Sequence, residues 1–331
     1  MLGQAPRPAT GGAVNQRAPV AFVFHDRCLE HSNGPGHPER PERVAAIRDH
    51  LARRGLLDRL LVIRPDPCPI ESLARVHERG YIETIRRACE RAPVQLDPDT
   101  AVSPGSWEAA LLSAGGALAA CDAVASGKAG AAFVCTRPPG HHAEAGRAMG
   151  FCLFNNVAIA ARHLQDRHGA GRILIVDWDV HHGNGTQNTF AADDTVFYFS
   201  THQFPFYPGT GSARETGTGR GAGYTLNYPL PAGSGDAEYI EVFRDVLRPE
   251  IDRVQPEVIL ISAGFDAHRD DPLAGMSLTE KGYAAMTSIL REAADRHCGG
   301  RIISLLEGGY DLVALPASVE AHLEALGAFA D

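Results

Sequence analysis

A short apolar run that ends in charged side chains constrains the fold more than any other part of this chain. Residues Ile173–Val176 are β-branched or leucine, which is typical of a strand buried on both faces of a parallel sheet. Asp177, Asp179 and His181 follow at every second position, so an extended chain would turn all three side chains to the same side. The Gly-Asn-Gly at 183–185 then ends the strand.

These three side chains lie where open α/β sheets bind their ligands, at the carboxyl end of a parallel strand. Two carboxylates and an imidazole provide the oxygen and nitrogen donors that suit a divalent metal such as zinc. A polar strand end solvated by water is the alternative interpretation. Unpaired carboxylates directly beside a hydrophobic strand are costly, however, and this favours a metal site.

Further strand and helix patterns alternate along the chain. Strands are expected at Val20–Phe24, Ala131–Cys135, Thr195–Ser200, Tyr224–Tyr228, Val258–Ser262 and Ile302–Leu306. Helices are expected at Glu39–Arg53, Ile70–Glu90, Ser106–Ser126, Asn155–His168, Asp236–Val254, Leu278–His297 and Leu312–Leu326. This alternation predicts an α/β fold with a mainly parallel sheet and helices on both faces. No linker divides the chain, so we expect a disordered tail over residues 1–18 and a single domain over residues 19–331.

Three more of these strands end in polar residues. Ala131–Cys135 leads to His141 and His142, Val258–Ser262 leads to Asp266, and Ile302–Leu306 leads to Tyr310; we expect all of these side chains at one edge of the sheet, with Asp266 as a third metal ligand. Each group has a simpler interpretation, as a surface histidine pair, a helix cap or a core aromatic. These simpler interpretations would have to hold together at four strand ends, which favours one shared site.

Composition narrows the function further. Hydrophobic residues make up 44% and charged residues 21% of the chain, as in ordinary globular proteins, and the formal charge of −9 argues against direct nucleic-acid binding. No apolar run approaches the length of a membrane span and Met1–Arg17 lacks the apolar core of a signal peptide, so we expect a cytoplasmic protein that does not enter a membrane. The seven scattered cysteines contain no Cys-x-x-Cys pair and are interpreted as small core residues.

Three loops carry further histidine, acidic or glycine residues. His31 and His37 lie in one loop, where we expect exposed histidines rather than ligands. Asp97–Pro104 is expected to be a loop with two exposed carboxylates. The glycine-rich run Gly217–Gly223 precedes a strand instead of opening a helix, so a flexible loop is favoured over a phosphate-binding loop.

The motifs at the strand ends resemble the signature set of the zinc-dependent histone deacetylase superfamily. They are Arg137-Pro-Pro-Gly-His-His-Ala-Glu144, Gly150-Phe-Cys-Leu-Phe-Asn155, Val176-Asp-Trp-Asp-Val-His-His-Gly-Asn-Gly-Thr-Gln187, Ala263-Gly-Phe-Asp266, Asp271-Pro-Leu273 and Glu307-Gly-Gly-Tyr310. The third motif is most similar to the class II deacetylases and their bacterial amidohydrolase relatives. The resemblance implies a single arginase-like α/β domain with an eight-stranded parallel sheet, and hydrolysis of N-acetyl or other N-acyl amines.

The resemblance also assigns metal ligands. Asp179, His181 and Asp266 would hold one zinc ion per chain, with open positions for water and the amide carbonyl. A structural potassium ion would be held by oxygens of Asp177, Asp179, His181 and Ser200. A dimanganese ureohydrolase of the arginase type is a rival interpretation, and about one metal per chain would argue against it.

The remaining catalytic roles follow from the same resemblance. His142 would be the general base, and His141 would assist it electrostatically. Tyr310 would donate a hydrogen bond to the developing oxyanion. Asp177 would accept a hydrogen bond from His141, and Asn184 lies where the partner of His142 belongs. Because class I enzymes carry an aspartate at that position, the neutral amide should stabilise the imidazolium of His142 less.

A tunnel for the acylated amine is implied as well. Gly150 and Phe151 would form one wall, and Tyr207, or Phe206 in its place, would form the other. Leu273 would lie at the mouth, where relatives selective for acetylpolyamines tend to carry a glutamate. We therefore expect acetylated lysine in peptides or proteins as the substrate, with acetylated polyamines as the alternative. A catalytically silent reader of acyl-lysine is disfavoured because base, ligands and tyrosine are all present, and the oligomeric state stays open.

Overall fold

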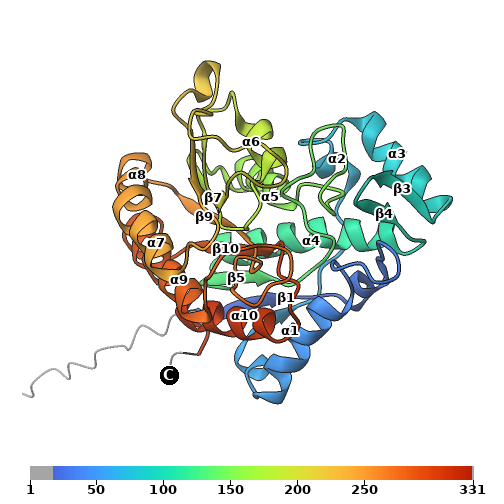
Figure 1. Cartoon of the computed structure of the whole chain (residues 1–331), viewed down its shortest axis with the longest axis horizontal. Coiled ribbons are helices and arrows are strands. Elements are labelled where there is room, and N and C mark those ends of the chain that lie inside the picture. The colour runs from blue at the N-terminus through green and yellow to red at the C-terminus, as the bar shows by residue number, and fades with distance from the viewer. Residues whose placement is uncertain (1–17, 330–331) are drawn as a thin grey trace, which may run out of the picture.

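An eight-stranded, entirely parallel sheet forms the centre of the molecule (Figure 1). The computed structural model describes residues 18–329, so the predicted tail, except Ala18, lies outside the described residues. The sheet order is β2-β1-β5-β10-β9-β6-β7-β8. The strands are β1 (Val20–Val23), β2 (Leu61–Ile63), β5 (Ala131–Val134), β6 (Ile173–Asp177), β7 (Val196–Gln203), β8 (Thr225–Leu230), β9 (Val258–Ala263) and β10 (Ile302–Leu306). The predicted α/β class with helices on both faces is confirmed.

Helices cover both faces of the sheet (Figure 1). One face packs against α1 (Glu42–Arg53), α7 (Asp236–Glu241), α8 (Arg248–Val254), α9 (Glu280–His297) and α10 (Ala314–Ala325), and the other against α4 (Ser106–Ala125), α5 (Asn156–His168) and α6 (Asn184–Phe190). Two further helices, α2 (Ile70–Leu73) and α3 (Arg79–Glu90), contribute to a smaller third cluster outside α4. A π-helical segment, Val242–Leu247, joins α7 to α8.

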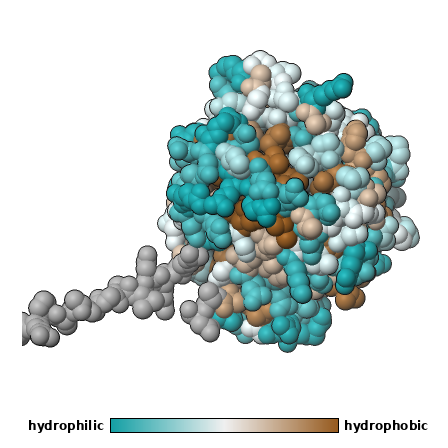
Figure 2. Space-filling model, turned by 60° about the vertical axis from the view of Figure 1, so that its left-hand side comes forward, coloured by the Kyte–Doolittle hydropathy of each residue, from teal (hydrophilic) through white to brown (hydrophobic). Residues whose placement is uncertain are grey.

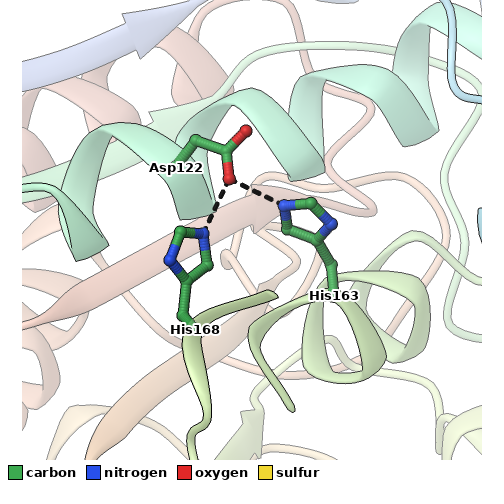
Figure 3. Close-up of side chains that lie close together, drawn as sticks. All are labelled: Asp122, His163 and His168. Atoms are coloured by element: carbon green, nitrogen blue, oxygen red, sulfur yellow. Dashed lines mark hydrogen bonds and ion pairs between the residues drawn. The ribbon is translucent and has the colours of Figure 1, made fainter. Parts of the chain in front are cut away.

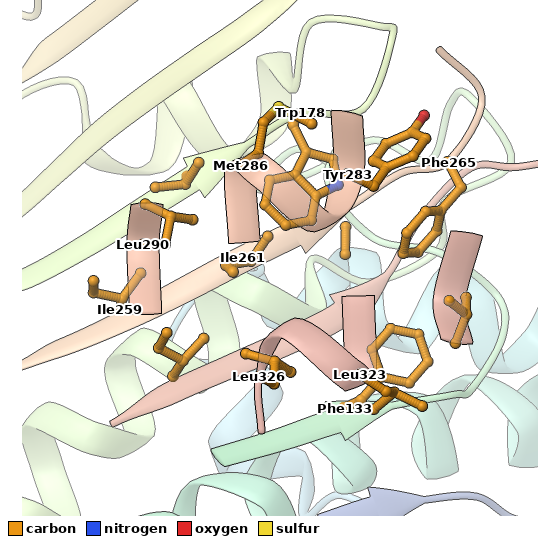
Figure 4. Close-up of a cluster of buried hydrophobic side chains, with 14 of the residues drawn as sticks. Phe133, Trp178, Ile259, Ile261, Phe265, Tyr283, Met286, Leu290, Leu323 and Leu326 are labelled. Carbon is orange, nitrogen blue, oxygen red and sulfur yellow. The ribbon is translucent and has the colours of Figure 1, made fainter. Parts of the chain in front are cut away.

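The strand side chains alternate between two separate cores. Leu174 and Val176 of β6 face the α9 and α10 side, whereas Ile173 and Ile175 face α4 and α5. Figure 4 shows the first core, in which Trp178 packs among aromatic and aliphatic side chains of β9, α9 and α10. All five residues of β6 are buried, as expected for a central strand covered on both sides. The outer surface in Figure 2 is largely hydrophilic around a recessed apolar strip.

Several elements differ from the sequence-based expectations. The predicted loop at 97–104 is partly a hairpin, formed by β3 (Val94–Asp97) and β4 (Thr100–Val102). The predicted helix at 70–90 is divided into α2 and α3, and the edge strand β2 was not expected. The expected absence of a membrane-length apolar run was also wrong, because α4 is long and apolar enough to cross a membrane. Of the apolar stretch within α4, 72% is buried inside the protein. The helix therefore serves as a core helix here.

The seven cysteines are all buried and none forms a disulfide. Burial raises the pKa of each thiol, for example to about 11 at Cys28 and at Cys298. The cysteines therefore act as small core side chains, as predicted.

Candidate active site

The three predicted metal ligands converge at the carboxyl edge of the sheet. Asp179 and His181 follow β6, and Asp266 follows the neighbouring strand β9. Nδ1 of His181 lies 3.1 Å from Oδ1 of Asp179 and 3.2 Å from Oδ2 of Asp266. One ligand atom from each residue lies within 4.8 Å of the other two. Both carboxylates are buried, whereas 12% of the His181 side chain is exposed, so the cluster can be reached from one side.

The surroundings of these donors fit a divalent cation. Oδ1 of Asp266 accepts a hydrogen bond from the Val180 N–H over 2.9 Å, whereas the buried Oδ2 has no hydrogen-bond partner among residues 18–329. Burial raises the pKa of Asp266, and the neighbouring charge of Asp179 raises it further. Burial alone would lower the pKa of His181, but its close contacts with the two carboxylates raise it to about 9. A cation between the three groups would satisfy Oδ2 and offset the carboxylate repulsion.

Two glycines allow the backbone to approach the carboxylates closely. A Cβ on Gly264 would lie 2.2 Å from Oδ2 of Asp179, and a Cβ on Gly308 would lie 2.1 Å from Oδ2 of Asp266. Both distances are far inside van der Waals contact, so a side chain at either position would displace a ligand. Gly308 also donates its N–H to Oδ2 of Asp179 over 2.8 Å. The glycines of these two motifs therefore position the predicted metal ligands.

The two histidines of the loop after β5 make different contacts. Nδ1 of His141 lies 3.1 Å from Oδ2 of Asp177, and Nδ1 of His142 lies 2.8 Å from Oδ1 of Asn184. The Asn184 amide is oriented by Glu144, whose Oε1 accepts from Nδ2 over 2.7 Å. The carbonyl of Asn184 therefore faces His142, which assigns the proton of the neutral imidazole to Nδ1 and leaves Nε2 as an acceptor.

The two imidazoles differ in charge. Burial alone would lower the pKa of His141, but Asp177 and Asp179 raise it to about 10, so this ring carries a positive charge at neutral pH. Burial lowers the pKa of His142 well below its ordinary value, and the adjacent His141 and His181 lower it further. His142 is therefore neutral at physiological pH and able to accept a proton. The ring centroids of the pair lie 4.0 Å apart.

Tyr310 is held by residues from distant parts of the chain. The guanidinium of Arg43, on α1, lies 4.7 Å from the centroid of the tyrosine ring and donates to the carbonyls of Gly309 and Glu307. Oδ2 of Asp271 accepts from the Tyr310 N–H over 2.7 Å. A charge over the ring and an anchored backbone fix the direction of the phenol, which burial and nearby carboxylates keep protonated by raising its pKa.

Glu307 anchors the loop after β5, which carries His141 and His142. Its Oε2 accepts from the N–H groups of Gly140 and His141 over 2.6 and 3.1 Å. Burial raises the pKa of this carboxyl to about 7. Glu307 thereby connects the end of β10 to the loop after β5 and fixes the position of His141 relative to Tyr310.

A narrow cavity of about 70 Å³ ends at these groups. It is lined by Asp99, Pro139, His141, His142, Gly150, Phe151, His181, Tyr207, Gly308 and Tyr310. Of the two aromatics predicted for the second wall, Tyr207 lines the cavity, with its ring 5.2 Å from that of His142, whereas Phe206 stacks on His181 at 5.3 Å. Leu273 is half-buried and is not among the lining residues; Oδ1 of Asp271 accepts from its N–H over 3.0 Å.

The other wall is built with unusual backbone conformations. Gly150 has φ of +56°, and a Cβ there would lie 2.2 Å from Cδ2 of His142, so the glycine is required. Phe151 has φ of +68°, a conformation that costs a bulky residue on the order of 1–3 kcal/mol. Its N–H donates to Oγ1 of Thr100 over 2.9 Å, and its ring meets that of Tyr310 edge to face. The hairpin β3–β4 thus supports the wall that carries Phe151.

Two expectations about loop residues need correction. His31 is fully buried rather than exposed: its Nδ1 lies 2.7 Å from Oγ of Ser106, and its Nε2 lies 3.5 Å from Oε2 of Glu39. The loop folds inward because Glu39 is buried in salt bridges with Arg43 and Arg137. The two loop carboxylates are half-buried, with Asp97 paired with Arg147 and Asp99 at the cavity.

Sequence reasoning thus located the residues at the strand ends but missed those that support them. Arg43 carried no local signal because it lies on an ordinary amphipathic helix. The role of Glu144 was missed because that residue ends a motif that was selected for its two histidines. Ser200 pairs with Asp177 between β7 and β6, and its Oγ contacts Nδ1 of His202; its part in a potassium site stays a prediction.

The parallel α/β fold and the residues at the carboxyl edge of its sheet are those of a metal-dependent hydrolase that acts on amide bonds. A model of the histone deacetylase domain matches residues 37–326. The chain belongs to the histone deacetylase family, whose members are zinc-dependent. A crystal structure of the HDA15 HD domain superimposes with a TM-score of 0.88 at 40% identity, covering 93% of this chain and 90% of that one.

Named relatives differ in substrate. A probable deacetylase of Archaeoglobus fulgidus is 42% identical, with 94% of this chain and 87% of that protein aligned. A histone deacetylase-like amidohydrolase of Pseudomonas aeruginosa is 40% identical over 93% of this chain and 86% of that protein. A polyamine deacetylase of Homo sapiens is also 40% identical, over 85% of this chain and 43% of that protein. The comparisons therefore give the class of reaction and leave the acylated amine open.

Proposed function

We propose that this protein removes acetyl or other acyl groups from the ε-amine of lysine in peptides or proteins, with one zinc ion at Asp179, His181 and Asp266. The observation that carries this proposal is the narrow cavity between Phe151 and Tyr207, which ends at the metal cluster. A cavity of about 70 Å³ with aromatic walls accommodates an unbranched aliphatic chain such as the lysine stem and excludes bulky groups. The amide at the end of that chain is then placed beside the histidine pair.

Zinc in this cluster would polarise the substrate carbonyl and make a water molecule more acidic. The residues of the chain supply the proton transfers. His142 is neutral and carries its proton on Nδ1, so its Nε2 accepts a proton from water and returns it to the leaving amine. His141, positively charged beside Asp177, stabilises negative charge that develops at the reacting carbonyl.

Tyr310 supplies the hydrogen bond to the oxyanion. Its phenol stays protonated because its pKa is raised, and its ring is held by Arg43. A donor fixed before the reaction needs no reorganisation when charge develops, which is why such donors contribute about a hundredfold to a thousandfold in rate.

A second substrate class is favoured by one observation. Asp99 lines the cavity, and a carboxylate there can pair with a secondary ammonium of an acetylated polyamine. The polyamine deacetylase of Homo sapiens among the relatives supports acetylated polyamines as this second class. Leu273 does not line the cavity itself, but the family resemblance places it at the mouth. There it argues the other way, because an apolar side chain offers no charge to a cationic substrate that loses hydration.

Catalytic efficiencies on an acetyl-lysine peptide and on N8-acetylspermidine test the substrate assignment. We expect the parent enzyme to prefer the peptide, and Leu273→Glu to shift the ratio toward the polyamine by about fivefold, the value of an exposed charge pair of ~1 kcal/mol. Val62→Glu is the matched control, since it adds the same charge at an exposed position of the edge strand β2. A parent enzyme that prefers the polyamine would overturn the lysine assignment and leave the amidohydrolase class intact.

Two substitutions test the chemistry itself. Asp266→Ala should lose the zinc ion of this cluster and, with it, hydrolysis, because it removes a buried carboxylate whose Oδ2 accepts no hydrogen bond within residues 18–329. His142→Ala should lower kcat more than His141→Ala, because only His142 is neutral and able to accept a proton. Equal losses in the two histidine variants would contradict the assignment of the base.

A further inference from the structure

A second group of side chains with metal-ligand donor atoms lies on α4 and α5, the helices that pack on one face of the sheet. Nε2 of His163 and Nε2 of His168 each lie 2.7 Å from the same oxygen, Oδ1 of Asp122 (Figure 3). The two histidines belong to the last turns of α5, and Asp122 lies near the end of α4. One ligand atom from each residue lies within 4.8 Å of the others. The group is accessible, with side-chain exposures of 59% for Asp122, 12% for His163 and 27% for His168.

This group is separate from the active site. Asn155 caps the start of α5 and contacts the carbonyl of Ala143 beside the histidine pair, whereas His168 ends the helix just before β6 begins. Because α5 has 13 residues, its two ends lie roughly 20 Å apart at 1.5 Å per residue. The three side chains therefore lie near the amino edge of the sheet, and the catalytic cluster lies at the carboxyl edge.

The surroundings leave room for further ligands. Asp122 and His163 line a cavity of about 510 Å³ between α2, α4 and α5, which is much larger than the catalytic cavity. Water from this cavity can reach the coordination positions that the protein does not fill. Nothing in the proposed deacylase reaction uses these residues.

The geometry points to a divalent transition metal as the ligand of this group. Two imidazole nitrogens and one carboxylate oxygen form a donor set that suits Zn²⁺, Ni²⁺ or Cu²⁺. Donors of a tetrahedral ion at ~2.0–2.1 Å are about 3.3 Å apart, so the nitrogen–oxygen distances of 2.7 Å need to open by a few tenths of an ångström. An exposed aspartate on a helix surface can make that adjustment by rotating its side chain.

The convergence of both imidazoles on one oxygen distinguishes this group from an ordinary ion pair. An ordinary ion pair needs one imidazole at a carboxylate, whereas two imidazole nitrogens and one carboxylate oxygen that converge can share a single cation. We propose that Asp122, His163 and His168 bind a second divalent transition-metal ion, which joins the last turn of α5 to α4.

Zinc binding at equilibrium tests this site. The full-length protein is dialysed against micromolar free Zn²⁺, and bound zinc is counted in the parent, in His163→Ala/His168→Ala and in Asp266→Ala. We expect two zinc ions per chain in the parent and one in each variant, with peptide hydrolysis retained by the histidine variant. His297→Ala is the matched control, because its Nε2 lies 2.7 Å from Oδ1 of Asp252 and the described residues place no second imidazole there; it should keep two.

A conservative substitution distinguishes metal binding from simple hydrogen bonding between the two helices. Asp122→Asn keeps an oxygen acceptor for the histidines but removes the anionic ligand. In an Asp266→Ala background, where the catalytic site is disabled, zinc should raise the Tm of the protein when Asp122 is intact and not when it is asparagine. Equal zinc counts in the parent and the double histidine variant, or the same zinc-induced rise in Tm with asparagine at 122, would overturn the proposal.

Discussion

Asn184 offers the sharpest test of the proposed base, because its amide joins two titratable groups. Oδ1 faces Nδ1 of His142 over 2.8 Å, and Nδ2 donates to Oε1 of Glu144 over 2.7 Å. Asn184→Asp therefore places a carboxylate beside His142 and also sets it against Glu144. Because two carboxylates at that distance tend to share a proton, the single variant should leave His142 beside a largely neutral acid. Asn184→Asp/Glu144→Gln restores a donor and keeps the new carboxylate charged.

The expected shift can be worked from the geometry. In the paired variant the imidazolium of His142 gains a negative neighbour whose charge centre is ~5 Å away, which at an effective dielectric constant of about 20 is worth about 3 kcal/mol. That energy corresponds to a rise of roughly 2 in the pKa of His142. His142 accepts a proton only when it is neutral, so activity is lost as pH falls through its pKa. The acidic limb of the rate profile therefore moves to higher pH by roughly 2 units in the paired variant and by much less in Asn184→Asp alone.

The assay is kcat/KM for an acetyl-lysine peptide across the acidic and neutral range, with bound zinc measured for every protein. Glu144→Gln alone is the control, since it changes the orienting residue without adding a charge beside His142. If the acidic limb of the paired variant coincides with that of the parent while both hold the same zinc, His142 is not the group that titrates. A single variant that shifts as far as the pair would show that Glu144 does not restrain the new carboxylate.

Three further substitutions probe the surroundings of the metal ligands and of the tyrosine. Gly308→Ala would place a Cβ 2.1 Å from Oδ2 of Asp266, so we expect most of the catalytic zinc to be lost; full zinc content in that variant would contradict the close-approach argument. Tyr310→Phe should keep its zinc and lower kcat about a hundredfold to a thousandfold, and hydrolysis at the parent rate would remove the tyrosine from the mechanism. Asp271→Asn replaces the carboxylate that accepts from the Tyr310 N–H and should lower kcat by up to about a hundredfold through misplacement of the phenol, with KM nearly unchanged; unaltered kcat would show that the loop holds its position without that charge.

The central strands of the fold could be predicted from the sequence because burial on both faces leaves an unmistakable apolar run. Ile302–Leu306 has the predicted bounds, and Ile173–Val176 is extended by one residue. The edge strand β2 carries no such signal, since its three residues are partly exposed and pair on one side only. The break between α2 and α3 at residues 74–78 contains neither proline nor glycine, so local pattern gives no reason to interrupt the helix.

The residues of the site likewise divide into those that the sequence could predict and those that it could not. Asp179, His181 and Asp266 could be located because parallel strands place their carboxyl ends at one edge, which turns three distant segments into one cluster. Arg43 could not, because its contact with the carbonyl of Gly309 joins residues 266 positions apart, and nothing on α1 distinguishes it from a solvated arginine. The left-handed conformation of Phe151 is likewise imposed by its tertiary surroundings, against the preference of the residue.

The burial of every cysteine has a practical consequence for following this enzyme in solution. Thiols that are shielded from solvent and have raised pKa values react slowly with maleimides and iodoacetamides, so the unmodified chain already serves as a silent background for site-directed labelling. Val313 is 80% exposed and follows Tyr310 by three residues. A single fluorophore introduced at Val313→Cys would therefore report on the segment that carries the tyrosine as substrate enters, without the removal of any native cysteine.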